Sequence, residues 1–157
     1  VDLGEIIEDV AEDARLEAAP KRCRIEVSLP ETIEVSGSQE LLHRAIENVV
    51  RNAVRHAPTD SAVDIAASID AARRQVVIDI TDSGGGVPES DLDAIFTPFF
   101  RVDNAGMSDG YGLGLAITRR IVAAHGGGIT AANRSAGGLR VTLRLPVDKT
   151  AGRPIQA

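Results

Sequence analysis

The amino-acid sequence predicts an α+β fold, a two-layer sandwich in which a mixed, mostly antiparallel sheet packs on three helices. Three stretches place apolar residues at helical spacing, and shorter stretches with strand-like alternation lie between and after them. The 157 residues are 43% hydrophobic and 25% charged, which is typical of a globular domain with a single core. We expect this domain to span residues 1–148, and residues 149–157 to form a loosely ordered tail.

The N-terminal segment is expected to form a helix followed by two strands. Asp2 can cap the helix, Pro20 lies just past its end, and the apolar residues between them follow helical spacing. These residues are Leu3, Ile6, Ile7, Val10 and Ala14. Alternation then predicts a strand over residues 23–29 and a shorter one over residues 33–35.

A second, longer helix and a pair of strands are expected next. Ser38 can cap this helix, which should run to about His56 because Pro58 cannot continue it. Its apolar face consists of Leu42, Ile46, Val49, Val50 and Ala53. Residues 62–69 and 75–81 alternate like strands, and the short polar link between them predicts an antiparallel pair.

The C-terminal part combines an irregular region, a helix and two strands. A brief helix is expected near Pro88, followed by irregular chain to residue 111. The next helix should cover residues 113–125, where a glycine follows its end. The last two strands are expected over residues 128–133 and 139–145.

Charge and cysteine content exclude several functional classes. A formal net charge of −6 argues against a protein that binds nucleic acid by neutralising phosphates. The single cysteine, Cys23, excludes an intrachain disulfide and a multi-cysteine zinc site. No apolar run approaches the roughly 18 residues that a membrane-spanning helix needs, and no targeting segment is present. Because the chain begins with Val1 rather than Met, we expect it to be a piece of a longer protein.

One face of the second helix carries polar side chains that could bind a nucleotide. Asn48, Asn52, Arg55 and His56 fall within about a 100° arc of the helical wheel, opposite the apolar face. Two carboxamides one turn apart offer oxygens to a hard cation, and a basic side chain one turn later can meet a phosphate. An ordinary solvated helix face is the alternative explanation. Glu47 lies outside this arc, which favours a surface role for it.

Glycines are concentrated in the C-terminal half, where twelve of the 15 lie between residues 84 and 138. The run Asp-Ser-Gly-Gly-Gly over residues 82–86 places a carboxylate at a strand end, beside backbone that can curl around a ligand. The run Gly-Tyr-Gly-Leu-Gly over residues 110–114 leads into a helix whose free amides can hold an anion. Surface turns are the alternative explanation. Neither the Walker pattern nor G-x-G-x-x-G is present.

The ordered motifs resemble those of the ATP-binding catalytic domain of sensor histidine kinases, within the wider GHKL ATPases. Residues 48–53 (Asn-Val-Val-Arg-Asn-Ala) resemble its N box, residues 82–86 its first glycine box, residues 96–101 its F box and residues 110–114 its second glycine box. Nearly the whole chain, from residue 2 to residue 146, takes part in the similarity. The resemblance implies the GHKL (Bergerat) type of sandwich, with ATP and Mg²⁺ as cofactors.

The resemblance implies roles for residues at the phosphates. Asn52 would coordinate the Mg²⁺ that bridges the phosphates, with Asn48 beside it, and Arg55 and His56 would contact phosphate oxygens. Catalysis is thereby assigned to Asn48, Asn52 and Arg55. The second glycine box would contribute further nucleotide contacts, chiefly the amides of its last two glycines, from Tyr111, Gly112, Leu113, Gly114 and Leu115.

The resemblance also implies how the base is bound. Asp82 would accept a hydrogen bond from the adenine amino group, while Gly84 and Gly86 would let the backbone approach the base. Residues 101–112 would form the ATP lid. The F-box phenylalanines would anchor this lid, although plain core packing explains them equally well.

Two departures from the family pattern concern the chemistry. Leu139 follows Gly138 where many relatives have Gly-Thr, so a hydroxyl contact near the adenine is not expected. Asn48 stands where the hydrolytic GHKL ATPases carry a glutamate base, which argues against efficient activation of water.

These features predict a histidine protein kinase domain that presents Mg-ATP to a histidine outside this chain. The family's acceptor is usually followed by an acidic residue in a helical hairpin, a pattern absent from all three histidines, His43, His56 and His125. The expected partners are the dimerisation hairpin of the parent kinase and, through the parent, a response regulator. We expect the domain in the cytoplasm and its parent in the cell membrane. The alternatives are a stand-alone GHKL serine kinase and a nucleotide sensor without transferase activity.

Overall fold

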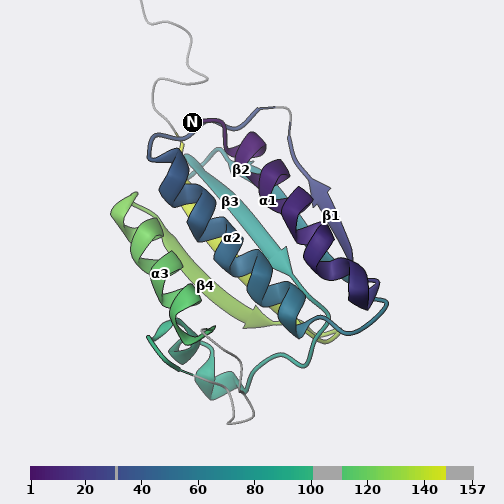
Figure 1. Cartoon of the computed structure of the whole chain (residues 1–157). Helices are drawn as coiled ribbons and strands as arrows, with labels where there is room; N and C mark the ends of the chain where they lie inside the picture. The colour runs from purple at the N-terminus through teal and green to yellow at the C-terminus, as the bar shows by residue number, and fades with distance from the viewer. Residues whose placement is uncertain (31, 101–110, 148–157) are drawn as a thin grey trace, which may run out of the picture.

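The computed structural model describes residues 1–30, 32–100 and 111–147 of the chain. In these residues, one five-stranded sheet lies behind three helices, with α1, α2 and α3 side by side on the same face (Figure 1). The helices are α1 (Leu3–Ala18), α2 (Gln39–His56) and α3 (Tyr111–Ala124), and the short 3-10 turns are η1 (Ala19–Lys21), η2 (Glu89–Asp91) and η3 (Ala94–Phe96). The strands are β1 (Arg24–Ser28), β2 (Ala62–Asp70), β3 (Gln75–Thr81), β4 (Gly128–Asn133) and β5 (Leu139–Pro146).

The sheet has the strand order β1-β2-β3-β5-β4. Only the β1–β2 pair is parallel, and the other neighbouring pairs are antiparallel. Strand β3 lies at the centre and buries every second side chain, with Val76, Ile78 and Ile80 at most 1% exposed. This alternation turns the apolar face of the sheet toward the helices and leaves the other face polar. The predicted two-layer, mixed and mostly antiparallel architecture is confirmed.

Both long N-terminal helices begin at the caps that the sequence predicts. The Asp2 carboxylate accepts a hydrogen bond from the amide of Glu5 at 3.2 Å, and the Ser38 hydroxyl accepts one from the amide of Leu41 at 3.1 Å. In α2, Val49 is only 1% exposed, so this position belongs to the core rather than to the polar arc.

Three elements differ from the sequence-based expectations by more than one residue at an end. Residues 33–35 form no strand but an isolated bridge, because the chain that they pair with turns into α1 at Leu3, whose amide already bonds to the Ile33 carbonyl at 2.9 Å. The expected helix near Pro88 consists of the two 3-10 turns η2 and η3. Helix α3 begins two residues earlier than expected, at Tyr111.

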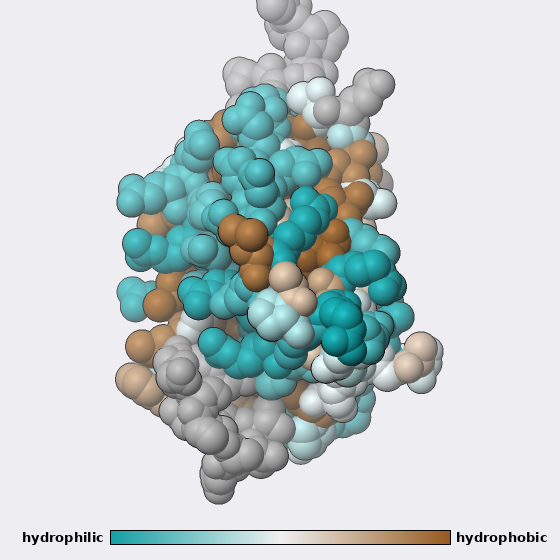
Figure 2. Space-filling view, turned by 45° about the vertical axis from the view of Figure 1, so that its right-hand side comes forward, coloured by the Kyte–Doolittle hydropathy of each residue, from teal (hydrophilic) through white to brown (hydrophobic). Residues whose placement is uncertain are grey.

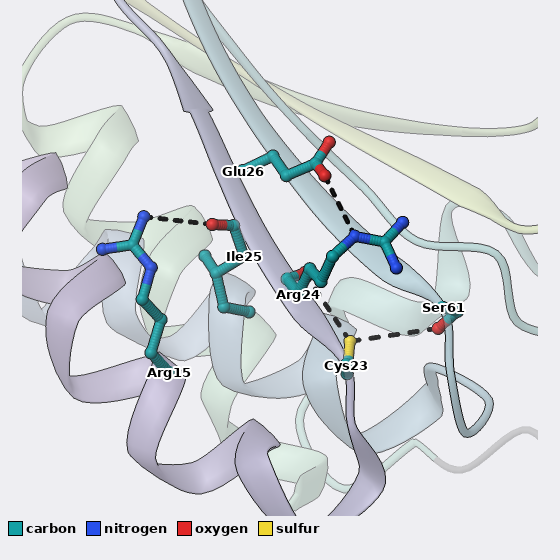
Figure 3. A network of polar contacts seen from close by, with 6 residues as sticks. All are labelled: Arg15, Cys23, Arg24, Ile25, Glu26 and Ser61. Carbon is teal, nitrogen blue, oxygen red and sulfur yellow. Dashed lines mark hydrogen bonds and ion pairs between the residues drawn. The ribbon is translucent and has the colours of Figure 1, made fainter.

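Polar contacts attach the edge strand β1 to its surroundings (Figure 3). Arg15 on α1 donates to the carbonyl of Ile25 at 3.0 Å, which ties the helix to the strand beneath it. At the start of β1, the Cys23 thiol is buried and accepts from the Ser61 hydroxyl at 3.9 Å. These contacts use backbone and side-chain groups of an edge strand that pairs with β2 alone.

One face of the molecule is mainly polar. Figure 2 shows hydrophilic side chains over most of the face turned to the viewer, with smaller apolar groups between them. A few large apolar side chains of the described residues are well exposed, among them Leu16 at 77% and Phe99 at 75%. None of the described helices is long and apolar enough to cross a membrane.

Candidate nucleotide-binding site

The C-terminal half of α2 borders both glycine boxes. The side-chain amide of Asn48 donates to the carbonyl of Gly114 on α3 at 3.1 Å, across 66 positions of sequence. Near the end of the same helix, the carbonyl of His56 lies against Gly84, so closely that a Cβ atom at this glycine would be 2.5 Å from the oxygen. The fold therefore brings together three of the motifs that the sequence singles out.

Helices α2 and α3 run antiparallel, and hydrogen bonds join them along their length. Besides the Asn48 contact, the hydroxyl of Thr118 donates to the carbonyl of Ala45 at 2.8 Å. At the far end, the His125 ring accepts from the amide of Ser38 at 3.2 Å through Nε2. The Ser38 cap and α2 residues 45 and 48 pair with His125, just after α3, and with α3 residues 118 and 114, respectively. The next turn of α2, which carries Asn52, therefore runs toward the start of α3.

Asp82 is a buried carboxylate at the end of the central strand, only 3% exposed. Its Oδ1 atom accepts hydrogen bonds from the amides of Gly84 at 2.7 Å and Leu139 at 3.4 Å. The hydrogen bonds within the described part of the chain use Oδ1 and leave Oδ2 available to a donor. A buried carboxylate held in this way is a strong acceptor for a ligand amino group.

The strand β5 begins so close to Asp82 that no side chain fits between them. Gly138 has a φ of +101°, and a Cβ atom there would overlap the Asp82 carbonyl oxygen. The side chain of the next residue, Leu139, is 6% exposed and belongs to the core, while its backbone bonds to Asp82 through both N–H and C=O. Leu139 thus supports the carboxylate through its backbone.

Two residues that the sequence analysis did not single out hold the first glycine box. The Asn133 side chain accepts from the amide of Val87 at 2.9 Å and donates to its carbonyl at 2.7 Å. The guanidinium group of Arg134 donates to the Asp82 carbonyl at 3.1 Å. Gly86 has a φ of +73°, and a Cβ atom there would be 2.5 Å from Asn133 Oδ1. The only sequence signal for this pair is two polar residues at the end of a strand.

The last turn of α2 is positively charged. Lys21 donates to the carbonyls of Val54 at 2.7 Å and Arg55 at 3.0 Å, which caps the helix. Although the His56 side chain is exposed, partial desolvation lowers the pKa of its imidazole below the usual value; Asp82 opposes this shift, and the charges of Arg55 and Lys21 add to it. The lowered pKa favours the neutral ring, which can donate one hydrogen bond and accept another.

The F box and the second glycine box are described only in part. Phe96 is 4% exposed and belongs to the core, Phe100 packs against the core, and Phe99 is exposed with a φ of +67°. Residues 101–110 of the expected lid lie outside the described residues.

On α3, the side chain of Leu115 is 7% exposed and belongs to the core, whereas Leu113 is 39% exposed. Any contact of Leu115 with a ligand would therefore use its backbone. Gly114 is close to Asn48, and a Cβ atom there would be 3.7 Å from the Asn48 side chain.

A buried carboxylate at the end of a central strand, asparagines on the covering helix and a glycine-rich helix start define a nucleotide-binding domain on an α+β sandwich. A family model described as "Histidine kinase-, DNA gyrase B-, and HSP90-like ATPase" matches residues 37–149. The chain belongs to this family and is an ATP-binding catalytic domain of the sensor histidine kinase type.

The similarity to individual proteins extends over almost the whole chain. The sensor protein CutS of Streptomyces coelicolor is 35% identical over 150 residues, 94% of this chain and 36% of that protein. The signal transduction histidine-protein kinase BaeS of Escherichia coli is 32% identical over 157 residues, 99% of this chain and 33% of that protein. This chain thus spans about a third of the length of these two relatives.

Solved structures show the same fold. The mycobacterial sensor histidine kinase MprB superposes with a TM-score of 0.85 at 30% identity, over 94% of this chain and 97% of that chain. The ATP-binding domain of PrrB from Mycobacterium tuberculosis gives a TM-score of 0.70 at 32% identity, over 94% of this chain and 95% of that chain. The predicted GHKL fold and its assignment to histidine kinases are confirmed.

Proposed function

We propose that this chain binds Mg-ATP and presents it for phosphoryl transfer to a histidine on a dimerisation hairpin outside the chain. The observation that carries this proposal is the position of α2, whose C-terminal half contacts the second glycine box through Asn48 and the first through the His56 carbonyl. A ligand that lies along this half of α2 would have Asp82 at one end and the start of α3 at the other.

The adenine base is assigned to the Asp82 end of the site. Oδ2 of Asp82 accepts the adenine amino group, while the amides of Gly84 and Leu139 hold Oδ1 and so fix the carboxylate. Gly84 and Gly86 let the backbone lie close to the base. A buried charged acceptor favours a base with an amino group over one with a carbonyl at that position, which makes the site selective for adenine.

The phosphates are assigned to the other end. Arg55, about one turn after Asn52, contacts phosphate oxygens, and the amides of Gly112 and Gly114 add neutral donors at the start of α3. The sequence-based assignment of His56 to the phosphates is not kept in this proposal, because the His56 carbonyl lies against Gly84, nearer the base. Asn52 offers a carboxamide oxygen to Mg²⁺, which suits a hard cation that keeps few protein ligands. The donor set therefore fits the metal, which neutralises phosphate charge when bound.

The nucleophile must come from outside this chain. Phosphoryl transfer depends mainly on positioning and charge neutralisation, which Asn48, Asn52 and Arg55 supply. Asn48 has no basic group, and its amide already bonds to Gly114, so it cannot activate water. The acceptor is then the histidine of the parent's hairpin. From this histidine the phosphoryl group would pass to a response regulator on the cytoplasmic side of the parent's membrane.

A reconstitution experiment tests this function. The chain should bind ATP, label itself hardly at all and hydrolyse ATP slowly, whereas addition of the parent's acceptor hairpin should produce an acid-labile, base-stable phosphohistidine. The Asn52→Ala variant should form none. If the isolated chain is labelled as fast as the chain mixed with the hairpin, the proposal is contradicted. Labelling of a partner serine would indicate a serine kinase. ATP binding without any transfer would indicate a nucleotide sensor.

A further inference from the structure

Thr118 is one of three polar or charged residues that are buried among those described, and it is fully inaccessible to solvent. It lies in the middle of α3, on the side that faces α2. Its hydroxyl donates to the carbonyl of Ala45 at 2.8 Å, so the two helices are joined by a side chain at a depth where apolar residues are usual. A valine of nearly the same shape would pack there without this bond.

The Thr118 bond forms a reciprocal pair with the Asn48 bond. Ala45 lies about one turn before Asn48 on α2, and Thr118 lies about one turn after Gly114 on α3. In one bond α3 provides the side chain and α2 the carbonyl, and in the other the roles are reversed. Two bonds one turn apart near the start of α3 oppose its sliding and rotation on α2. Without the Thr118 bond, the Asn48 bond would remain there, with the Ser38–His125 bond at the far end of the pair.

We propose that Thr118 is a positioning residue for the phosphate end of the nucleotide site. It holds the start of α3, with the amide of Gly112, in register with Asn52 on α2. The adenine end does not depend on it, because Asp82 is fixed by bonds to Gly84 and Leu139. This inference rests on the proposed nucleotide site. It predicts that loss of the hydroxyl weakens binding of the phosphates and not of the base.

The test compares ATP with adenosine by titration calorimetry, in the presence of Mg²⁺. Thr118→Val should weaken ATP binding about three- to tenfold, the effect of one lost hydrogen bond, and leave adenosine binding unchanged. Thr118→Ser should restore ATP affinity, and Thr118→Ala, which differs from it only by the hydroxyl, should not. This second pair keeps the test valid if the valine variant does not fold.

Thr142→Val provides a matched control. Thr142 is 8% exposed, and its hydroxyl donates to Asp79 Oδ1 at 2.6 Å on the polar face of the sheet, away from the helices. The control should lower thermal stability without changing the ratio of ATP to adenosine affinity. If Thr118→Val lowers stability alone, or weakens ATP and adenosine equally, Thr118 has only a structural role and the inference is overturned. A parent chain that binds neither ligand would instead overturn the proposed function.

Discussion

Replacement of Asp82 by asparagine would separate the ligand contact of this residue from its structural contacts. Oδ1 of Asp82 accepts from the amides of Gly84 and Leu139, and the oxygen of an asparagine side chain can accept both bonds. Oδ2, which is proposed to accept the adenine amino group, becomes an NH₂ group that faces another donor. The variant should therefore fold but lose the ligand contact, whereas alanine would lose both.

The expected loss follows from the burial of the carboxylate. Asp82 is 3% exposed, so its bond to the adenine amino group is a bond to a charged acceptor shielded from water. Such bonds contribute about 1.5–3 kcal/mol, which corresponds to roughly 10- to 150-fold weaker binding of ATP to Asp82→Asn. Titration calorimetry with ATP measures this change, and thermal unfolding without ligand reports whether the fold is kept.

Asp79→Asn is the matched control for this prediction. Asp79 is on the same strand, but its Oδ1 accepts from the Thr142 hydroxyl on the polar face of the sheet. The control should bind ATP like the parent chain. If Asp82→Asn keeps both the parent's unfolding temperature and its ATP affinity, Asp82 does not bind the base, and the assignment of the adenine end is wrong.

Three further predictions concern the metal, the backbone and pH. Asn52→Ala should make ATP affinity nearly insensitive to Mg²⁺ in calorimetry, and a metal effect of the parent's size would exclude Asn52 as ligand. In denaturant unfolding, Gly138→Ala should lower the free energy of unfolding by at least about 2 kcal/mol more than Gly137→Ala, because both positions have positive φ but only Gly138 meets the Asp82 carbonyl. Equal losses in the two variants would contradict this close contact. The lowered pKa of His56 means that the unfolded chain binds its proton more readily, so the free energy of unfolding should fall as the pH drops below about 6.5 and level off below the folded pKa. His56→Gln should flatten that pH dependence, and an unchanged profile would contradict the assignment.

Elements with clear periodicity and clear ends were predictable from the sequence. The observed bounds of strands β3 and β4 agree with those expected from the sequence, because turn-forming residues follow each of them. The segment 33–35 has the same alternation, yet it forms only a bridge, since strand formation also needs a partner of sufficient length. A local sequence pattern does not show whether such a partner is present in the fold.

The residues of the candidate site also differ in whether the sequence predicts them. Asp82 and Asn48 were identified because their motifs are local and ordered along the chain. Thr118, Asn133 and Arg134 act through contacts with residues 73, 46 and 52 positions away, which no periodicity reveals. The sequence contains one signal for Thr118, a threonine within the mainly apolar α3, because a buried hydroxyl group needs a hydrogen-bond partner.

Two glycines beside Asp82, Gly84 and Gly138, have a structural requirement that is independent of any nucleotide. A side chain at Gly84 would press on the His56 carbonyl, and one at Gly138 would overlap the carbonyl of Asp82. Because both contacts are with backbone, neither can be relieved by a change of rotamer. Weaker ATP binding after replacement of these glycines would therefore not distinguish loss of a ligand contact from displacement of α2 and β5. Variants of Asp82 and Asn52, which change side-chain chemistry and leave the backbone contacts intact, are the ones that can assign the two ends of the nucleotide.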